Sequence, residues 1–368
     1  MKSLLNKLVI LFTILTPSIT EAQNYVQIAD SVRFSRSVPA MAYAVITSDS
    51  IIEVGFCGFR KFRTRDSLRM QDRFDIGTNT AALTSYIAAR LVESGKIDWT
   101  TKLLDVFPEF KSRCLPVYRN ISLSDLLSNQ TRLPLYATLD DWYKIPDFTG
   151  NTMSARRKNF TLFMIEQKPY MENVVSRKIE FSMAGYVVAT SMLEKVAHKK
   201  WENLVNDYIN DPLKMNCKFG WPNLTDTAAA IGHWSQGNYF HSEDANTWVK
   251  PNALLYPAHD INMDLSDYIR FMQEMLRALK GEKAHISQSN AAYILYGIPD
   301  YSLGWNNGSL NDYTYAFHEG ISLLYNCRAE VIKEKNTAII VLCNSGDRDG
   351  RGAVVNLVRI LEAKFLDR

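Results

Sequence analysis

The stretch FDIGTNTA, residues 74–81, decides the fold, because it leads directly into a long segment that is apolar and nearly uncharged. Residues 81–93 place Leu83, Ile87 and Leu91 at helical spacing, with small alanines between them. This pattern predicts a helix that is buried nearly all round. Gly95 follows it, and we expect this glycine to end the helix. Thr78 therefore stands at the N-terminus of a buried helix.

Strand patterns lie toward both ends of the chain. Two apolar runs, residues 41–46 and 51–56, are joined by the turn-forming residues TSDS and predict a β-hairpin. Near the C-terminus, strands are predicted at residues 313–317, 322–332 and 337–343, followed by a helix over 353–365. Between the two ends, helices are predicted at residues 122–128, 184–197, 201–209 and 266–279. The sequence predicts an α+β fold in which an antiparallel sheet from both chain ends is flanked by helices and carries an inserted all-helical lobe.

This pattern divides the chain into regions. Residues 23–110 and 250–368 are expected to form the α/β sheet region, and residues 111–249 the helical lobe, together as one domain. A cleft is expected where the lobe meets the sheet region, because ligand sites prefer such junctions.

The first 22 residues have the layout of a secretory signal peptide. Lys2 and Lys7 give a basic start, residues 8–15 are apolar, and small residues at positions 20 and 22 precede the expected cleavage before Gln23. The apolar run is shorter than the roughly 20 residues that a membrane span needs, and no later stretch is long enough. We expect an exported protein, periplasmic or secreted, without a membrane span after cleavage.

The composition excludes several classes of function. With 46% hydrophobic and 22% charged residues, the chain is ordinary for a globular protein. Its formal net charge of +3 comes without a basic run, which argues against nucleic acid as a partner. The five cysteines have no CxxC spacing and the histidines lack the spacing of metal ligands, so no metal and no cofactor are expected.

Five blocks of sequence, in order, carry a resemblance to a known family. Residues 74–81 with the helix ending LVESGKID resemble the F-x-I-G-S-x-x-K block of the class C β-lactamase-like proteins, a branch of the serine β-lactamase and penicillin-binding-protein family. The further blocks are ISLSDLLS at 121–128 with Leu133-Pro134, FSMAGY at 181–186 with EKV at 194–196, PA at 257–258 with SDY at 266–268, and LGW at 303–305, HEG at 318–320 and VLCN at 341–344. The resemblance runs from about residue 25 to the C-terminus and implies the same α+β architecture.

The resemblance also implies a catalytic arrangement. In that family the serine of S-x-x-K attacks the substrate, the lysine one helical turn later is its base, and a tyrosine of Y-x-N assists. Two backbone N–H groups stabilise the oxyanion in this acyl transfer. Here Thr78 stands at the serine position and Ala81 at the lysine position. Phe181 replaces the tyrosine and Met183 the asparagine.

These replacements predict a protein that lacks the family's catalysis. Losing one member of a nucleophile–base unit can cost on the order of 10⁶ in turnover. Here the nucleophile, the base and the tyrosine that relays the proton are all replaced. The family's third motif, H/K-x-G, is retained as His318, Glu319 and Gly320. The N–H of Ile321, the next residue, is expected to be an oxyanion donor beside that of Thr78. The leading interpretation is a catalytically inactive homologue retained for binding.

The expected ligand cleft comprises the residues at these positions: Thr78, Phe181, Met183, His318, Glu319, Gly320 and Ile321. The resemblance implies a ligand of the peptidoglycan or D-amino-acyl peptide type; a protein partner is the other candidate. One alternative is an active hydrolase with a non-standard nucleophile such as Thr78, or with water activated by His318 or Glu319. A second alternative is a scaffold that acts through its surface while Phe181 and Met183 fill the cleft.

Overall fold

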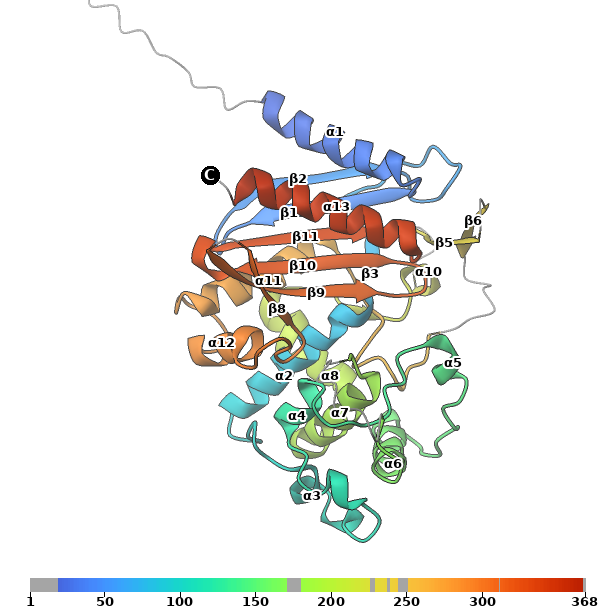
Figure 1. The fold of residues 1–368 in the computed structure, drawn as a ribbon, viewed down its shortest axis with the longest axis vertical. Helices are drawn as coiled ribbons and strands as arrows, with labels where there is room; N and C mark the ends of the chain where they lie inside the picture. Colours follow the sequence, from blue (N-terminus) through green and yellow to red (C-terminus); the bar gives the residue numbers. More distant parts are fainter. Residues whose placement is uncertain are drawn as a thin grey trace, which may run out of the picture.

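The computed structural model describes residues 19–170, 180–225, 229–236, 239–243, 251–310 and 312–366. Its main sheet is antiparallel throughout, with the strand order β2-β1-β11-β10-β9-β8 (Figure 1). The strands are β1 (Ala40–Ile46), β2 (Ile51–Gly58), β8 (Asn306–Leu310), β9 (Tyr313–Ile321), β10 (Asn326–Ile332) and β11 (Thr337–Cys343). Because β1 pairs with β11, the two ends of the chain meet in the sheet, which confirms the predicted fold class.

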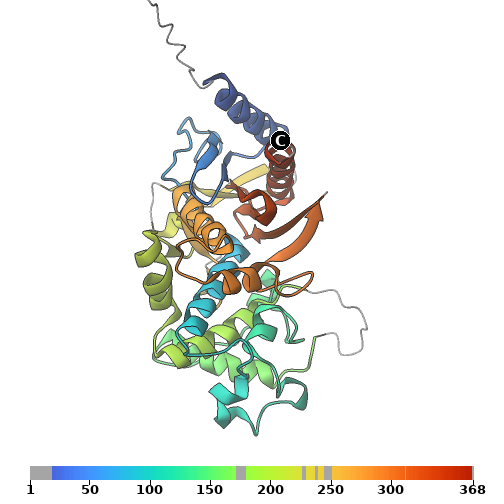
Figure 2. The same ribbon diagram turned by 90° about the vertical axis from the view of Figure 1, so that its left-hand side faces the viewer.

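Both faces of the main sheet are covered. Helices α1 (Ile19–Ser35) and α13 (Arg348–Phe365) lie on one face, and α2 (Thr80–Glu93) and α11 (Leu265–Leu279) lie on the other (Figures 1 and 2). Side chains alternate between the faces along a strand, so Met41 packs in the cluster with α13 while Ala42 belongs to the cluster with α2. Covering both faces explains why β1 and β11 read as continuous apolar runs.

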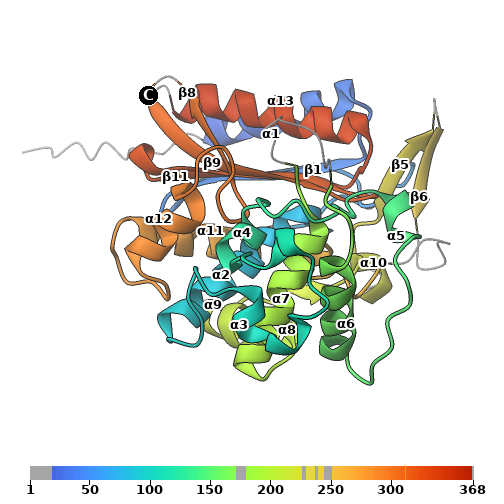
Figure 3. The ribbon, with the colours of Figure 1, turned by 60° about the horizontal axis from the view of Figure 1, so that its bottom comes forward.

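The inserted helices form the lobe below the sheet (Figure 3). They are α4 (Leu123–Leu127), α5 (Leu139–Trp142), α6 (Met153–Ile165), α7 (Met183–Ala197), α8 (Trp201–Val205), a π-helical turn (Asn206–Asn210) and α9 (Asp211–Leu213). The short helix α3 (Leu103–Val106), within the range expected for the sheet region, packs against α7 of the lobe. Helix α7 packs against α6, α4 and α2, which ties the lobe to the sheet region. Helices α1, α6 and α12 (Gln288–Tyr296) were not predicted, because their apolar residues do not gather on one helical face.

A second, small sheet positions the functional region. It pairs β3 (Arg73–Asp75), β7 (Ile261–Asp264) and β4 (Lys218–Phe219), while β5 (Gly232–Gln236) and β6 (Tyr239–Glu243) form a separate hairpin that follows α10 (Pro222–Thr225). Strand β3 leads through the 3₁₀ turn η1 (Gly77–Asn79) into α2. Thr78 therefore lies on the 3₁₀ turn that precedes α2, and the α-helix itself begins two residues later, at Thr80.

Within the described residues, no helix combines the length and apolar character needed to cross a membrane. The expected signal peptide falls largely on residues 1–18, which lie outside the described part of the chain.

Candidate functional site

Gly77 brings Thr78 against the end of β9. Its φ of +51° lies in the left-handed region that favours glycine. A Cβ atom built at Gly77 would lie 2.5 Å from the carbonyl oxygen of Ile321, so no other residue fits at this approach. The turn η1 is consequently pressed onto the last residues of β9, and the Thr78 side chain faces that strand.

The Thr78 hydroxyl is hydrogen-bonded on the strand. Its oxygen lies 3.0 Å from the carbonyl oxygen of Glu319, to which the hydroxyl donates, and it accepts a bond from the backbone N–H of Ile321 at 3.3 Å. The N–H of Ile321, expected as a free oxyanion donor, thus already binds the threonine oxygen. The prediction left this N–H available to a ligand, whereas in the structure the Thr78 hydroxyl points back to β9 and accepts its hydrogen bond.

His318 faces the same hydroxyl with one ring nitrogen. Its Nδ1 lies 2.5 Å from the carbonyl oxygen of Gly304, which can only accept, so Nδ1 carries the proton. Nε2 lies 3.3 Å from Thr78 Oγ1. Burial lowers the pKa of His318 to about 4, against opposing contributions from the Gly304 carbonyl and the charge of Glu319. The imidazole is therefore neutral at pH 7 and turns a lone pair toward Thr78.

The positions that the family uses for its base and relay are apolar and packed. Ala81 is fully buried in the first turn of α2. Phe181 stacks on Tyr186 with ring centroids 5.5 Å apart, and its ring meets that of His318 edge-on at 5.7 Å. Met183 is the first residue of α7 and is 3% exposed. These side chains offer no proton acceptor to Thr78.

A cavity of about 530 Å³ collects most of the predicted residues. Thr78, Phe181, Met183, His318, Glu319 and Ile321 all line it. Sequence reasoning missed other lining residues, among them Trp142, Tyr301 and Asn306, because none belongs to a family motif. Tyr301 donates or accepts a bond with the Tyr186 hydroxyl at 3.2 Å, and its ring lies 6.5 Å from that of His318. The cavity is thus walled by the lobe on one side and by the end of β9 on the other.

Two predicted cleft residues place no side chain in the cavity. The Glu319 carboxylate pairs with Arg328 at 2.9 Å and also with Arg351 of α13, on the face of the sheet opposite His318. Neighbouring residues of a strand point to opposite faces, so Glu319 contributes its backbone to the site and cannot activate water there. Gly320 does not line the cavity: a Cβ there would lie 2.2 Å from the carbonyl oxygen of Ile76. Both placements correct the predicted cleft.

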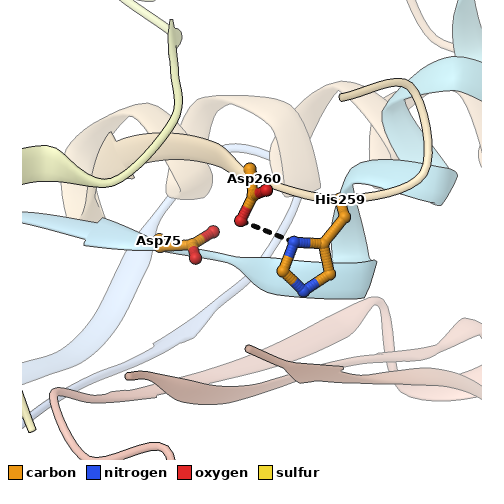
Figure 4. A group of neighbouring side chains, drawn as sticks. All are labelled: Asp75, His259 and Asp260. Atoms are coloured by element: carbon orange, nitrogen blue, oxygen red, sulfur yellow. Dashed lines mark ion pairs between the residues drawn. The ribbon is translucent and has the colours of Figure 1, made fainter. Parts of the chain in front are cut away.

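A buried polar cluster lies beside this site and was not predicted. Asp75 ends β3, and His259 and Asp260 precede β7 (Figure 4). Burial raises the pKa of Asp75 to about 8, and the charge of Asp260 acts in the same direction. Burial alone would lower the pKa of His259, but the charge of Asp260 and a hydrogen bond to it, with the charge of Asp75 and a bond to Ile321, raise it to about 9. His259 also lines the cavity.

Comparisons with known proteins agree with this fold. The family model described as Beta-lactamase matches residues 22–364. Protein flp of Staphylococcus aureus (strain MW2) is 20% identical over 320 residues, which cover 83% of this chain and 60% of flp. This chain therefore spans about 60% of the length of the flp relatives that it matches.

Two solved structures share the fold. The octameric penicillin-binding protein homologue from Pyrococcus abyssi has a TM-score of 0.73 at 16% identity, over 94% of this chain and 78% of that chain. The D-amino acid amidase from Ochrobactrum anthropi SV3, solved with L-phenylalanine, has a TM-score of 0.71 at 17% identity. The match covers 95% of this chain and 100% of the amidase chain. Because the family model matches residues 22–364, the chain belongs to the Beta-lactamase family.

Proposed function

We propose that this chain is an exported, catalytically inactive member of the Beta-lactamase family that uses its cavity to bind a small ligand. In this proposal residues 1–22 are a signal peptide, residues 23–110 with 250–368 form the sheet region, and residues 111–249 form the lobe. The protein acts outside the cytoplasm, in the periplasm or after secretion.

One observation carries the proposal of inactivity: among the described residues, the nearest acceptor for the Thr78 hydroxyl is the backbone of β9, not the imidazole of His318. The hydroxyl has one proton, and the Glu319 carbonyl at 3.0 Å is a closer acceptor than His318 Nε2 at 3.3 Å. A general base works best when its pKa lies near the operating pH, and the pKa of His318 is about 4. Both arguments oppose removal of the threonine proton at pH 7.

The open volume of the cavity supports binding of a small ligand, rather than the alternative in which side chains fill the cleft. Its volume of about 530 Å³ falls in the range of small-molecule sites, roughly 300–1,000 Å³. Apolar side chains such as Phe181 and Met183 supply contact area, and His318 Nε2 offers a hydrogen-bond acceptor to an incoming N–H group. A D-amino-acyl or peptidoglycan-type peptide has such N–H groups, and the amidase neighbour was solved with an amino acid.

A thermal-shift screen of short D-amino-acid peptides, stem peptides and simple esters tests this proposal. A ligand at about 100 times its Kd should stabilise the folded state by about 2.7 kcal/mol. No shift with any of them, together with a co-purifying protein whose binding survives His318→Ala, would favour the scaffold alternative and a protein partner.

A second candidate function has one observation in its favour. The pair Thr78 Oγ1 and His318 Nε2 lies at the edge of hydrogen-bond reach, and the Gly304 carbonyl orients the imidazole. This is the arrangement of a nucleophile, a base and an orienting group. A hydrolase using Thr78 and His318 would form an acyl-threonine, which intact-protein mass spectrometry detects.

A further inference from the structure

The cluster of Asp75, His259 and Asp260 has features that the family chemistry does not use. Their three candidate ligand atoms, one from each residue, all lie within 4.8 Å of one another. The side chains are almost inaccessible, with exposed fractions of 1%, 2% and 1%. Figure 4 shows the two carboxylates and the imidazole converging from β3 and from the loop before β7. Asp260 has a φ of +68°, an uncommon conformation for a residue other than glycine.

The charges of this cluster are only partly compensated. Asp260 Oδ1 lies 2.5 Å from His259 Nδ1 in an ion pair, and Asp260 Oδ2 has no hydrogen-bond partner among the described residues. Asp75 accepts the N–H of Gly77 at 2.8 Å and a side-chain hydrogen bond from Ser322. The single imidazole of His259 faces two carboxylates, so one buried negative charge is left without a cation, which is strongly unfavourable. A metal ion between the carboxylates would compensate that charge.

The imidazole of His259 is oriented as a metal ligand would be. Its Nε2 lies 3.0 Å from the carbonyl oxygen of Ile321, an acceptor, which places a proton on Nε2. Nδ1 lies 2.5 Å from Asp260 Oδ1 and, because the pKa of His259 is raised to about 9, it carries a proton at pH 7 that a bound metal ion would displace. Histidines that bind metals commonly donate their other N–H to a backbone carbonyl in this way.

We propose that Asp75, His259 and Asp260 bind one divalent transition metal ion of the Zn²⁺ or Mn²⁺ kind. One imidazole nitrogen with carboxylate oxygens is a ligand set that both ions accept. Three protein ligands leave at least one position for water or a small ligand, and His259 reaches the wall of the cavity. The ion would join β3 to the loop before β7 and, through the Nε2 bond of His259, to the end of β9. This inference does not depend on the proposed function.

Isothermal titration of the chelator-treated protein with Zn²⁺, and separately with Mn²⁺, tests the site. We expect one equivalent to bind, with affinity reduced about 100-fold or more in His259→Gln and in Asp260→Asn. His285→Gln is the matched control, because His285 is half-exposed and contacts Glu274 at 3.4 Å. With Co²⁺ as a spectroscopic probe, the absorption should lack the sulfur-to-metal band that binding by a cysteine would produce.

The wild-type titration decides the matter even if a variant fails to fold. Absence of one-equivalent binding of both Zn²⁺ and Mn²⁺ by the folded wild-type protein would overturn the proposal. Binding that persists unchanged in both ligand variants, or that shows thiolate bands with Co²⁺, would also overturn it. In either case the cluster would be an ion pair between an imidazolium and Asp260, and the proposed ligand cavity would be unaffected.

Discussion

The Nε2 atom of His318 lies 3.3 Å from the hydroxyl oxygen of Thr78, across the junction between β9 and the turn that begins α2. The pair occupies the place where the family's nucleophile meets its third motif. Ala81 and Phe181, which stand at the positions of the base and the relay, offer this pair no basic group. Under the proposed function, the protein would keep the geometry of the family's site without its base and relay.

The first prediction concerns the protonation of His318. Its pKa is lowered from an ordinary value of 6.5 to about 4. The unfolded chain therefore binds more protons between pH 6.5 and 4, so this residue's contribution to stability is full above about pH 6.5 and is lost as the pH falls toward 4. The loss amounts to about 3 kcal/mol. Urea unfolding at several pH values should show a smaller decrease in His318→Gln than in the wild type.

Nitrogen NMR of labelled histidines checks the same claim directly. His318 should stay neutral, with its proton on Nδ1, down to about pH 5. Burial also lowers the pKa of His233 to about 4. His233 is present in both the wild type and His318→Gln, so its contribution cancels when their unfolding free energies are compared. A His318 resonance that titrates near pH 6.5 would contradict the assignment.

The second prediction concerns ligand binding. A peptide whose N–H donates to His318 Nε2 should bind about 10-fold more weakly to His318→Ala, the cost of one hydrogen bond. Its affinity for the wild type should also fall toward pH 4, because protonated His318 can no longer accept that bond. Calorimetry with a hit from the thermal-shift screen measures both effects. His285→Ala, at a residue outside the cavity lining, should bind like the wild type, and equal losses in the two variants would exclude a direct contact with His318.

The third prediction concerns Gly320. A Cβ there would lie 2.2 Å from the Ile76 carbonyl oxygen and 2.3 Å from the Sγ of Cys327, so Gly320→Val should destabilise the folded state by about 3 kcal/mol. The matched control is Gly95→Ala: its Cβ would have no neighbour within 4 Å, although its φ of +68° carries a strain of about 1 kcal/mol. Urea unfolding measures both. Full stability of Gly320→Val would mean that η1 does not press on β9.

The fourth prediction asks whether activity can be restored. Thr78→Ser, Ala81→Lys, Phe181→Tyr and Met183→Asn together should give weak esterase activity, because the backbone of the site is retained. Each single change should give almost none, since the members of a catalytic unit act together. Hydrolysis of an activated ester is the assay, with circular dichroism as the check of folding. A folded but inactive quadruple variant would show that the cleft has changed beyond these four positions.

Much of the fold could be read from the sequence, because its blocks occur in family order and β1 and β11 are continuous apolar runs. The site was predicted less completely. His318 and Thr78 meet as expected, but the direction of Glu319 depends on which face of β9 it occupies, and the motif alone does not fix this. Asp75 and His259 are far apart in the chain, and only the pairing of β3 with β7 brings their regions together. No spacing rule reveals such a cluster.

Intact-protein mass spectrometry tests the central claim most directly. The protein is incubated with nitrocefin, penicillin and an activated ester, beside Thr78→Ala and an active β-lactamase as a positive control. The account predicts no adduct on this chain, because the Thr78 hydroxyl donates to the Glu319 carbonyl and His318, with a pKa of about 4, is a weak base at pH 7. A stoichiometric mass increase that disappears in Thr78→Ala would contradict it and establish Thr78 as a nucleophile.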